Sequence, residues 1–385
     1  MLILAASFGA AVIAIGLVAF SPGPTWKIRS LIGPTGTELY HPTSWNAGGT
    51  AILTEGPGFF QVLRPDGATI WRDGRGRAPA WVDDQTILVL DPIDPMTSRI
   101  RRIDLESGQR PVIGEVLRVG RLVGDGVGHM AWRTAIGDRE SIVLDPADGH
   151  EIARLPDLRA HLWVADGMLL LKDLARDFTT DHPAAGSLFV WDGDQKVRPI
   201  GSGLIELFDF LVPSPGGDAI ACICASTADA SASLDPGIYR VPLDGSAATM
   251  LMPWDQPIAT SYPVVAWLDE TSLAVIDRSG LTRVSTNGDR RALLGSDEEP
   301  TLTGDLGGPY RLQDVVVVSM NDPKDPDLVG QLVVIDDQQR IIVRQEFPAY
   351  NRPYLVVDRA RDRAILVTDP FLPDEPLKLF VLEYR

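Results

Sequence analysis

One arrangement of hydrophobic and polar positions recurs along the chain. It consists of a tryptophan, a polar turn of about four residues and an apolar strand. It begins at Trp45 (WNAGGTAILT), Trp81 (WVDDQTILVL), Trp163 (WVADGMLLLK) and Trp267 (WLDETSLAVI). A strand-rich repeat of about 35 to 55 residues is typical of a β-propeller, in which similar sheets surround a central axis. The pattern therefore predicts an all-β fold, with the repeated tryptophans in its core.

The repeat divides into units that are recognised by an apolar second strand. These strands are expected at residues 51–53, 87–89, 130–132, 169–171, 219–221, 273–275, 315–317 and 364–366. A third strand follows each of them, and most third strands end in a tight turn such as Pro65-Asp66-Gly67, where glycine permits a positive φ. We predict eight four-stranded blades. Seven blades is the alternative, if the third or seventh unit is a distorted insertion.

The two ends of the propeller region complement each other. The last unit lacks a fourth strand, because the chain ends at Arg385 directly after the third. A spare strand, Trp26–Gly33, precedes the first unit. Pairing between them would remove two open sheet edges, which otherwise promote aggregation. We expect residues 26–32 to pair with Leu377–Glu383 and to close the ring.

The first twenty residues carry no charged side chain. About 20 apolar residues are enough to cross a bilayer, and Pro22 and Pro24 would end a helix sharply. We predict a transmembrane helix over residues 1–21, a linker over 22–25 and the propeller over 26–385. A cleaved signal peptide fits less well, because no basic residue precedes the apolar run. The expected membrane-spanning residues are Leu2, Phe8, Ile13, Leu17 and Phe20, with Trp26 at the interface.

The side of the membrane depends on few charges. Lys27 and Arg29 directly follow the predicted span. The positive-inside rule favours the cytoplasmic side for the segment that carries them, and hence for the propeller. A periplasmic or other extracytoplasmic propeller is the alternative.

Charge and cysteine content narrow the classes of partner. The chain has 52 acidic and 35 basic residues and a net charge of −17. Such a surface repels nucleic acid and anionic headgroups, so contact with the bilayer must run through the apolar helix. Cys222 and Cys224 lie two apart in one strand, and their side chains point the same way. This geometry disfavours a mutual disulfide, and we expect buried, separate thiols.

The turn Pro213–Asp218 (PSPGGD), together with the tryptophan phrases, resembles the TolB-like and WD40-like propeller repeats. In those repeats an aromatic or Ser-Pro-Asp-Gly turn precedes an apolar strand. The resemblance covers residues 26–385 in architecture and indicates no specific family, because no Gly-His or Trp-Asp signature recurs at blade spacing. It implies that the loops between second and third strands emerge on one face of the propeller.

Five of those loops are long and rich in aspartate and proline, at residues 91–98, 172–186, 225–237, 321–330 and 369–376. Functional variation concentrates on such loops, and prolines lower the cost of ordering them. We expect them to contact other protein subunits. The candidate contact residues are Asp91, Asp94, Asp181, Asp235, Asp322, Asp325, Asp327, Asp369, Phe371, Asp374 and Glu375.

Motifs for catalysis and cofactor binding are absent from the sequence. It contains no G-x-S-x-G elbow, no Walker A loop and no G-x-G-x-x-G between a strand and a helix. The histidines, which lack zinc-ligand spacing, are His41, His129, His150, His161 and His182. No cofactor or metal is predicted; calcium at clustered aspartates, either Asp322, Asp325 and Asp327 or Asp91 and Asp94, is the alternative.

These observations favour a membrane-anchored, non-enzymatic propeller that serves as an accessory or scaffold subunit of a larger membrane complex. Respiratory, photosynthetic, transport and envelope complexes all fit. One alternative is an anchored hydrolase or lyase with acids from different blades in the central funnel. Another is a sensor of a ligand or of calcium.

Overall fold

The computed structural model of the 385-residue chain describes twenty-one segments. They are residues 26–31, 41–56, 59–73, 76–95, 97–117, 120–134, 140–164, 167–174, 186–193, 196–207, 210–226, 236–254, 265–277, 280–295, 306–313, 315–321, 329–336, 341–348, 351–358, 363–369 and 378–384. In these segments no helix has the length and apolar character that a membrane crossing needs. Residues 1–21 lie outside them, so the anchor stays a prediction.

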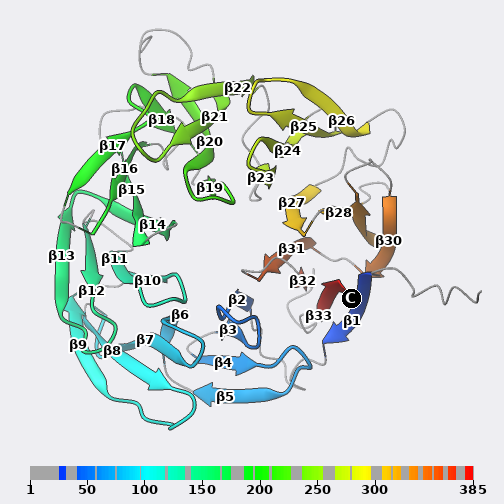
Figure 1. The fold of residues 1–385 in the computed structure, drawn as a ribbon. Helices are drawn as coiled ribbons and strands as arrows, with labels where there is room; N and C mark the ends of the chain where they lie inside the picture. The colour runs from blue at the N-terminus through cyan, green and yellow to red at the C-terminus, as the bar shows by residue number, and fades with distance from the viewer. Residues whose placement is uncertain are drawn as a thin grey trace, which may run out of the picture.

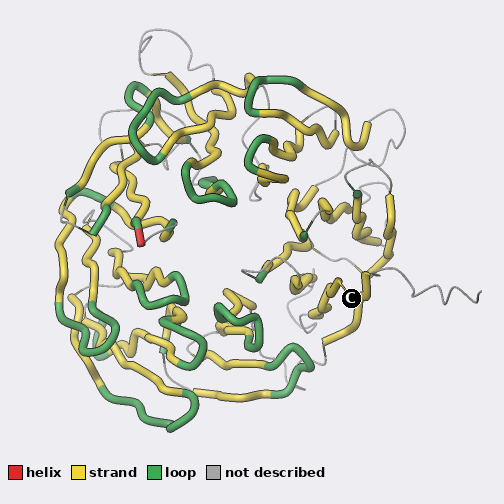
Figure 2. Tube along the Cα trace, viewed as in Figure 1, coloured by secondary structure: helices red, strands yellow, loops and turns green. Residues whose placement is uncertain are grey.

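Antiparallel sheets stand in a ring around a central space (Figure 1). Strands make up most of the described chain (Figure 2). Three four-stranded sheets come first: β2 (His41–Trp45), β3 (Ile52–Gly56), β4 (Phe59–Leu63) and β5 (Thr69–Asp73); β6 (Arg77–Trp81), β7 (Thr86–Pro92), β8 (Thr97–Asp104) and β9 (Val112–Leu117); β10 (Gly120–Gly124), β11 (Met130–Thr134), β12 (Glu140–Leu144) and β13 (Glu151–Pro156).

Three more four-stranded sheets complete the ring: β23 (Val265–Asp269), β24 (Ser272–Asp277), β25 (Gly280–Ser285) and β26 (Arg290–Gly295); β27 (Leu306–Leu312), β28 (Val315–Asn321), β29 (Val329–Ile335) and β30 (Ile341–Pro348); β31 (Asn351–Val357), β32 (Arg363–Asp369), β33 (Lys378–Tyr384) and β1 (Trp26–Leu31). The predicted all-β propeller is confirmed.

A nine-stranded sheet lies between these two groups. Its strands are β14 (Arg159–Trp163), β15 (Leu169–Leu174), β16 (Gly186–Trp191), β17 (Val197–Ile200), β18 (Leu204–Glu206), β19 (Val212–Pro213), β20 (Ala219–Ser226), β21 (Pro236–Pro242) and β22 (Thr249–Pro253). Strand β16 pairs along its length with β15 and β17, and it meets β18 through the pair Gly186 and Glu206. That pair joins two groups of strands, each with the order seen in the four-stranded sheets.

The apolar runs form the predicted second strands. They lie in or at the start of β3, β7, β11, β15, β20, β24, β28 and β32. Each is an inner strand with a partner on both sides, and therefore needs apolar residues on both faces. Residues 219–225 of β20, for example, are all buried. The predicted turns are also present, with Gly67 at φ +89° and Gly149 at φ +76°, in the left-handed region that glycine tolerates.

The N-terminal strand completes the last sheet. Strand β1 pairs antiparallel with β33, with Trp26 opposite Tyr384 and Leu31 opposite Leu379. It is the outer strand in the order β1-β33-β32-β31. The pairing predicted between residues 26–32 and 377–383 is confirmed. The observed partner of Trp26 is Tyr384, one residue beyond the predicted end of β33. This strand covers an edge of β33 that would otherwise be open.

The four repeat tryptophans link neighbouring sheets as well as filling the core. Trp45, Trp81, Trp163 and Trp267 are all at most 8% exposed, as predicted. Each indole Nε1–H donates to a carbonyl in the innermost strand of the preceding sheet. The acceptors are Val356 O (2.8 Å), Ser44 O (3.4 Å), Val123 O (2.9 Å) and Val212 O (2.8 Å), respectively.

The cysteine prediction needs a correction. Cys222 and Cys224 are buried in an apolar cluster with Leu170 and Ile220, as expected. They are nevertheless joined by a disulfide. Their Cα atoms are 5.9 Å apart, within the range that a disulfide accepts and below the roughly 6.6 Å that two residues of extended strand span. Local contraction of β20 therefore brings together two side chains that already share a face.

Candidate functional site

A cavity of about 380 Å³ is lined mainly by residues of β2, β6, β10 and β14. These are the innermost strands of four successive groups (Figure 1). Its lining is Ser44, Trp45, Pro79, Ala80, Trp81, Arg121–Gly126, Arg133 and His161–Trp163. Three repeat tryptophans thus contribute aromatic edges beside two arginines and a histidine. The volume is at the lower end of that of small-molecule sites.

Strand register places the basic side chains together. Arg121 of β10 lies directly opposite Arg133 of β11, so both project from one face of the sheet. That face packs toward β14, because Arg133 Nη1 donates to the carbonyl oxygen of Ala160 at 2.9 Å. His161, the next residue of β14, is partly buried and also lines the cavity. Arg121 is exposed to solvent.

Asp125 is the one carboxylate among the described residues of this lining. Its Oδ1 accepts the backbone N–H groups of Val127 (2.9 Å) and His129 (3.1 Å), and its Oδ2 lies 2.6 Å from His129 Nδ1. The His129 ring in turn lies 5.2 Å from that of Trp163. Asp125 therefore holds the turn between β10 and β11. The funnel acids of the hydrolase or lyase alternative are not brought together in this lining, and that alternative stays a prediction.

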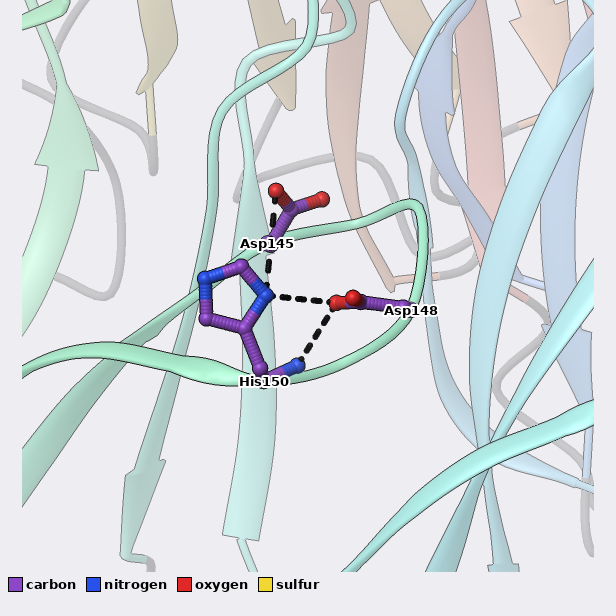
Figure 3. A group of neighbouring side chains, drawn as sticks. All are labelled: Asp145, Asp148 and His150. Atoms are coloured by element: carbon purple, nitrogen blue, oxygen red, sulfur yellow. Dashed lines mark hydrogen bonds and ion pairs between the residues drawn. The ribbon is translucent and has the colours of Figure 1, made fainter.

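A second group of polar side chains lies at the turn between β12 and β13 (Figure 3). The ligand atoms of Asp145, Asp148 and His150 lie within 4.8 Å of one another. Asp148 Oδ1 accepts the backbone N–H of His150 at 3.0 Å and lies 2.6 Å from His150 Nδ1 (Figure 3). Three donors are fewer than a structural zinc site or a calcium site uses.

Electrostatics explain what this turn does. The hydrogen bond with the Asp148 carboxylate raises the pKa of His150 above its ordinary value of 6.5. The backbone and side-chain hydrogen bonds from His150 lower the pKa of Asp148 below 3.8. The pair is thus an exposed ion pair over much of the acidic range. The hydrogen bonds between Asp148 and His150 therefore fasten the turn between β12 and β13.

The predicted docking residues lie in different settings. Asp91 lies opposite Arg99 in the pairing of β7 with β8 and forms an ion pair with Arg101 of β8, which also contacts Asp73 of β5 at 3.3 Å. The prediction of a long loop at residues 91–98 is wrong: β7 and β8 pair up to Pro92 and Ser98, and only residues 93–96 form the turn between them. Asp94 is exposed in that turn, and Asp369 is paired in β32. The others, Asp181, Asp235, Asp322, Asp325, Asp327, Phe371, Asp374 and Glu375, lie outside the described residues. Docking and calcium binding at these residues stay predictions.

Most of the predicted membrane residues also lie outside the part of the chain that the structure describes. Leu2, Phe8, Ile13, Leu17 and Phe20 lie outside the described residues. Trp26 is the first residue of β1, opposite Tyr384. Its assignment to the membrane interface stays a prediction.

Sequence reasoning missed two features of the site and its surroundings. The first is the group of basic residues in the cavity lining, Arg121, Arg133 and His161. The two arginines lie in the segments RLVG and AWRT, and their proximity follows only from the register of β10 and β11. The second is the ion pair between Lys172 and Glu206, both fully buried. Its signal is a single lysine at the end of the apolar run LLLK and a single glutamate in GLIELF.

Comparison with known proteins agrees with this fold. No family model matches the chain, and no curated protein sequence matches it. Among solved structures, dipeptidyl peptidase 4 of Porphyromonas gingivalis is similar with a TM-score of 0.55 and 9% identity, over 89% of this chain and 56% of that one. The WD40 domain of SCAP from fission yeast has a TM-score of 0.50 and 8% identity, over 93% and 94% of the two chains.

TolB from Acinetobacter baumannii matches with 15% identity over 81% of this chain and 63% of that one, with a TM-score of 0.36. The predicted resemblance is confirmed at the level of a β-propeller architecture, through the match to the WD40 domain. Identities this low indicate the fold alone, and the activity of none of these proteins transfers to this chain.

Proposed function

We propose that this chain is a non-enzymatic, eight-bladed propeller that serves as an accessory or scaffold subunit of a membrane protein complex. The nine-stranded sheet counts as two blades in this proposal, one of β14 to β17 and one built on β20 to β22. The contact of β16 with β18 at Gly186 and Glu206 is a short bridge between them. The N-terminal span over residues 2–20 anchors the propeller, and its cytoplasmic placement follows from Lys27 and Arg29.

The asymmetry of the connections carries this proposal. The strand order is the same in each four-stranded sheet, so second-to-third connections start and finish at one end of the ring. Four of them are long, at residues 175–185, 227–235, 322–328 and 370–377, and four are short, at residues 57–58, 93–96, 135–139 and 278–279. Third-to-fourth connections at the other end are no longer than residues 105–111, and the one at residues 64–68 is closed by the hydrogen bond from Arg64 N to Ala68 O at 2.8 Å. The longest connections within the blades therefore lie at one end of the ring.

The ring supplies a rigid base for those loops. The tryptophan hydrogen bonds tie adjacent sheets, and β1 fixes the last sheet. A fixed base lowers the entropy lost when loops dock on a partner, which raises affinity without additional contacts. The acidic composition of the chain favours a basic partner surface.

Purification of the full-length protein from its own membranes in mild detergent tests this function. We expect a stoichiometric complex with other membrane subunits. Recovery of a lone monomer with its own hydrolase or lyase activity would contradict the proposal. Alkaline carbonate provides a separate test of the anchor: the full-length chain should stay with the membrane, and a chain that begins at Pro24 should be released.

A further inference from the structure

The two ends of the ring carry different connections. Within each group of antiparallel strands, the first-to-second and third-to-fourth connections lie at the same end of the ring. We call this the turn end; it includes residues 64–68, 125–129 and 145–150. The second-to-third connections lie at the opposite end, which we call the loop end and which includes residues 93–96 and 175–185.

Exposed aliphatic side chains gather at the turn end. Seven large hydrophobic side chains are exposed in the described part of the chain, and six of them lie at this end. Five occupy the first or second position of a strand on the outside of the ring (Figure 1): Ile70 of β5, Val112 of β9, Ile152 of β13, Val197 of β17 and Met250 of β22. The sixth is Val127, in the turn between β10 and β11. Ile93, in the turn between β7 and β8, is the one at the loop end.

The distribution of these side chains calls for an explanation. Single exposed aliphatic residues are ordinary on a soluble surface. Here they recur at equivalent positions of five successive groups of strands, and each is between 37% and 51% exposed. The turn end therefore has a row of aliphatic side chains along its outer edge, which water solvates poorly.

Strand β1 indicates what lies next to the turn end. Strand β33 follows the connection at residues 370–377, so it begins at the loop end and reaches the turn end at Tyr384. Trp26 is paired with Tyr384 and therefore also lies at the turn end. The predicted linker, residues 22–25, spans at most roughly 14 Å when extended, whereas the six residues of β1 span about 20 Å. The predicted transmembrane helix thus joins the ring at its turn end.

We propose that the turn end faces the bilayer and that its outer row of aliphatic side chains contacts the lipid headgroup region. This inference rests on the anchor in the proposed function. Apolar side chains at a membrane surface bury themselves at the boundary between headgroups and acyl chains. The net charge of −17 disfavours anionic headgroups, so the expected contact is with a zwitterionic lipid such as phosphatidylcholine.

This orientation also defines the kind of partner that the long loops can reach. The connections at residues 175–185, 227–235, 322–328 and 370–377 lie at the loop end, and so point away from the bilayer. Their partner surface is therefore a water-exposed part of another subunit, at a distance from the membrane of about the length of a strand.

The test places a fluorescent label at one end of the ring at a time. The full-length protein is reconstituted into phosphatidylcholine vesicles, with or without phosphatidylcholine that carries a nitroxide quencher on its headgroup. Ile152→Cys and Ile93→Cys are a matched pair, because the isoleucines are 41% and 46% exposed and lie at opposite ends. Cys222 and Cys224, the two cysteines of the chain, are buried in a disulfide, so a maleimide dye reacts with the introduced thiol.

We expect the nitroxide lipid to lower the emission at residue 152 at least about twofold, because a side chain in contact with the bilayer lies within roughly 10 Å of the headgroups. The emission at residue 93 should not change. Val112→Cys is a second variant at the turn end if Ile152→Cys lowers the melting temperature. Equal quenching at the two ends, or quenching at residue 93 alone, overturns the proposal. A turn-end signal that follows protein concentration and not the nitroxide lipid also overturns it, in favour of a second copy of the chain at this surface.

Carbonate extraction of the same vesicles separates a wrong orientation from a wrong anchor. If the labelled protein stays with the vesicles and the label at residue 152 is not quenched, the orientation is wrong and the anchor stands. If carbonate releases the protein, the anchor and the orientation fail together.

Discussion

The indole Nε1 of Trp45 donates a hydrogen bond of 2.8 Å to the carbonyl oxygen of Val356, which lies 311 residues further along the chain. The bond joins β2 to β31, the innermost strands on the two sides of the seam where the ring closes. Arg363 lies over the same indole ring at 5.7 Å from its centroid. Two contacts thus hold the last sheet in place: the pairing of β1 with β33 at the outside of the ring, and this hydrogen bond on its inner side.

Trp45→Phe should lower the free energy of unfolding by about 2 kcal/mol more than Trp254→Phe. Both tryptophans are buried, at 7% and 5% exposure, so the loss of ring area is similar. The Trp254 indole N–H has no hydrogen-bond partner in the described part of the chain, whereas Trp45→Phe leaves the Val356 carbonyl unsatisfied. Urea unfolding of both variants measures the difference. Equal losses would show that the hydrogen bond across the seam adds nothing.

Removal of β1 should destabilise the last sheet. A chain that begins at Leu39 lacks the strand that pairs with β33 and exposes an open edge. Compared with a chain that begins at Pro24, it should melt at a lower temperature and aggregate sooner. Differential scanning fluorimetry and light scattering measure the two effects. Equal melting temperature and equal solubility of the two chains would refute closure through β1.

The buried ion pair of Lys172 and Glu206 should show strong coupling. Lys172→Met leaves a carboxylate at 0% exposure without its cation, and we expect a loss of about 3–5 kcal/mol in unfolding free energy. Lys172→Met combined with Glu206→Met should be less destabilising than the single change, because no buried charge is left alone. Chemical denaturation of the single and double variants gives the coupling energy.

An exposed pair provides the comparison for that experiment. Arg99 and Glu115 are 48% and 56% exposed, and Arg99→Met should cost less than about 1 kcal/mol. If Lys172→Met costs no more than Arg99→Met, the pair is not the link between the two groups of strands that its position at the β16–β18 bridge indicates.

The turn at His150 should have a measurable pH dependence. The pKa of His150 is raised, so its contribution to stability is full below pH 6.5 and is lost as the pH rises through the raised value. The pKa of Asp148 is lowered, so its contribution is present above pH 3.8 and is lost as the pH falls through the lowered value. Both residues therefore contribute to stability between pH 3.8 and pH 6.5.

A proton NMR titration of the His150 ring measures this directly. We expect a pKa above 6.5 in the unaltered protein and a return toward 6.5 in Asp148→Asn, because the hydrogen bond with the carboxylate is the largest cause of the shift. A pKa at or below 6.5 before substitution would show that the pair seen in the turn does not form in solution.

The sequence was sufficient for the architecture because its signals are local and repeated. Apolar runs such as residues 87–89 need cover on both faces, and turns such as Pro65-Asp66-Gly67 need a positive φ, so each unit encodes its own strands and turns. The pairing of β1 with β33 could also be predicted, because a spare strand at one end of the repeat and a missing strand at the other are best explained if the two ends pair.

The candidate site could not be predicted from the sequence in the same way. Arg121 and Arg133 are separated by a hairpin, and they meet at one face only in the observed register. Lys172 and Glu206 come from strands whose contact depends on Gly186, where an added Cβ would lie 1.9 Å from the Asp173 carbonyl oxygen. Long-range register and close backbone approach are consequences of packing, and single-sequence periodicity does not contain them.

The most direct measurement of the docking function compares partner recovery after the loops at each end of the ring are altered. Residues 322–328 and 370–377 are replaced by two-residue Asn-Gly turns, and the tight turns at residues 64–68 and 286–289 are replaced by alanine-containing turns as the control. Loop length has a small effect on stability, so circular dichroism should show that both proteins fold. Mild-detergent purification with quantitative mass spectrometry then measures the partner. We expect at least about a tenfold loss of partner with the shortened long loops and none with the altered turns. Unchanged recovery from the folded protein with shortened long loops would contradict the account.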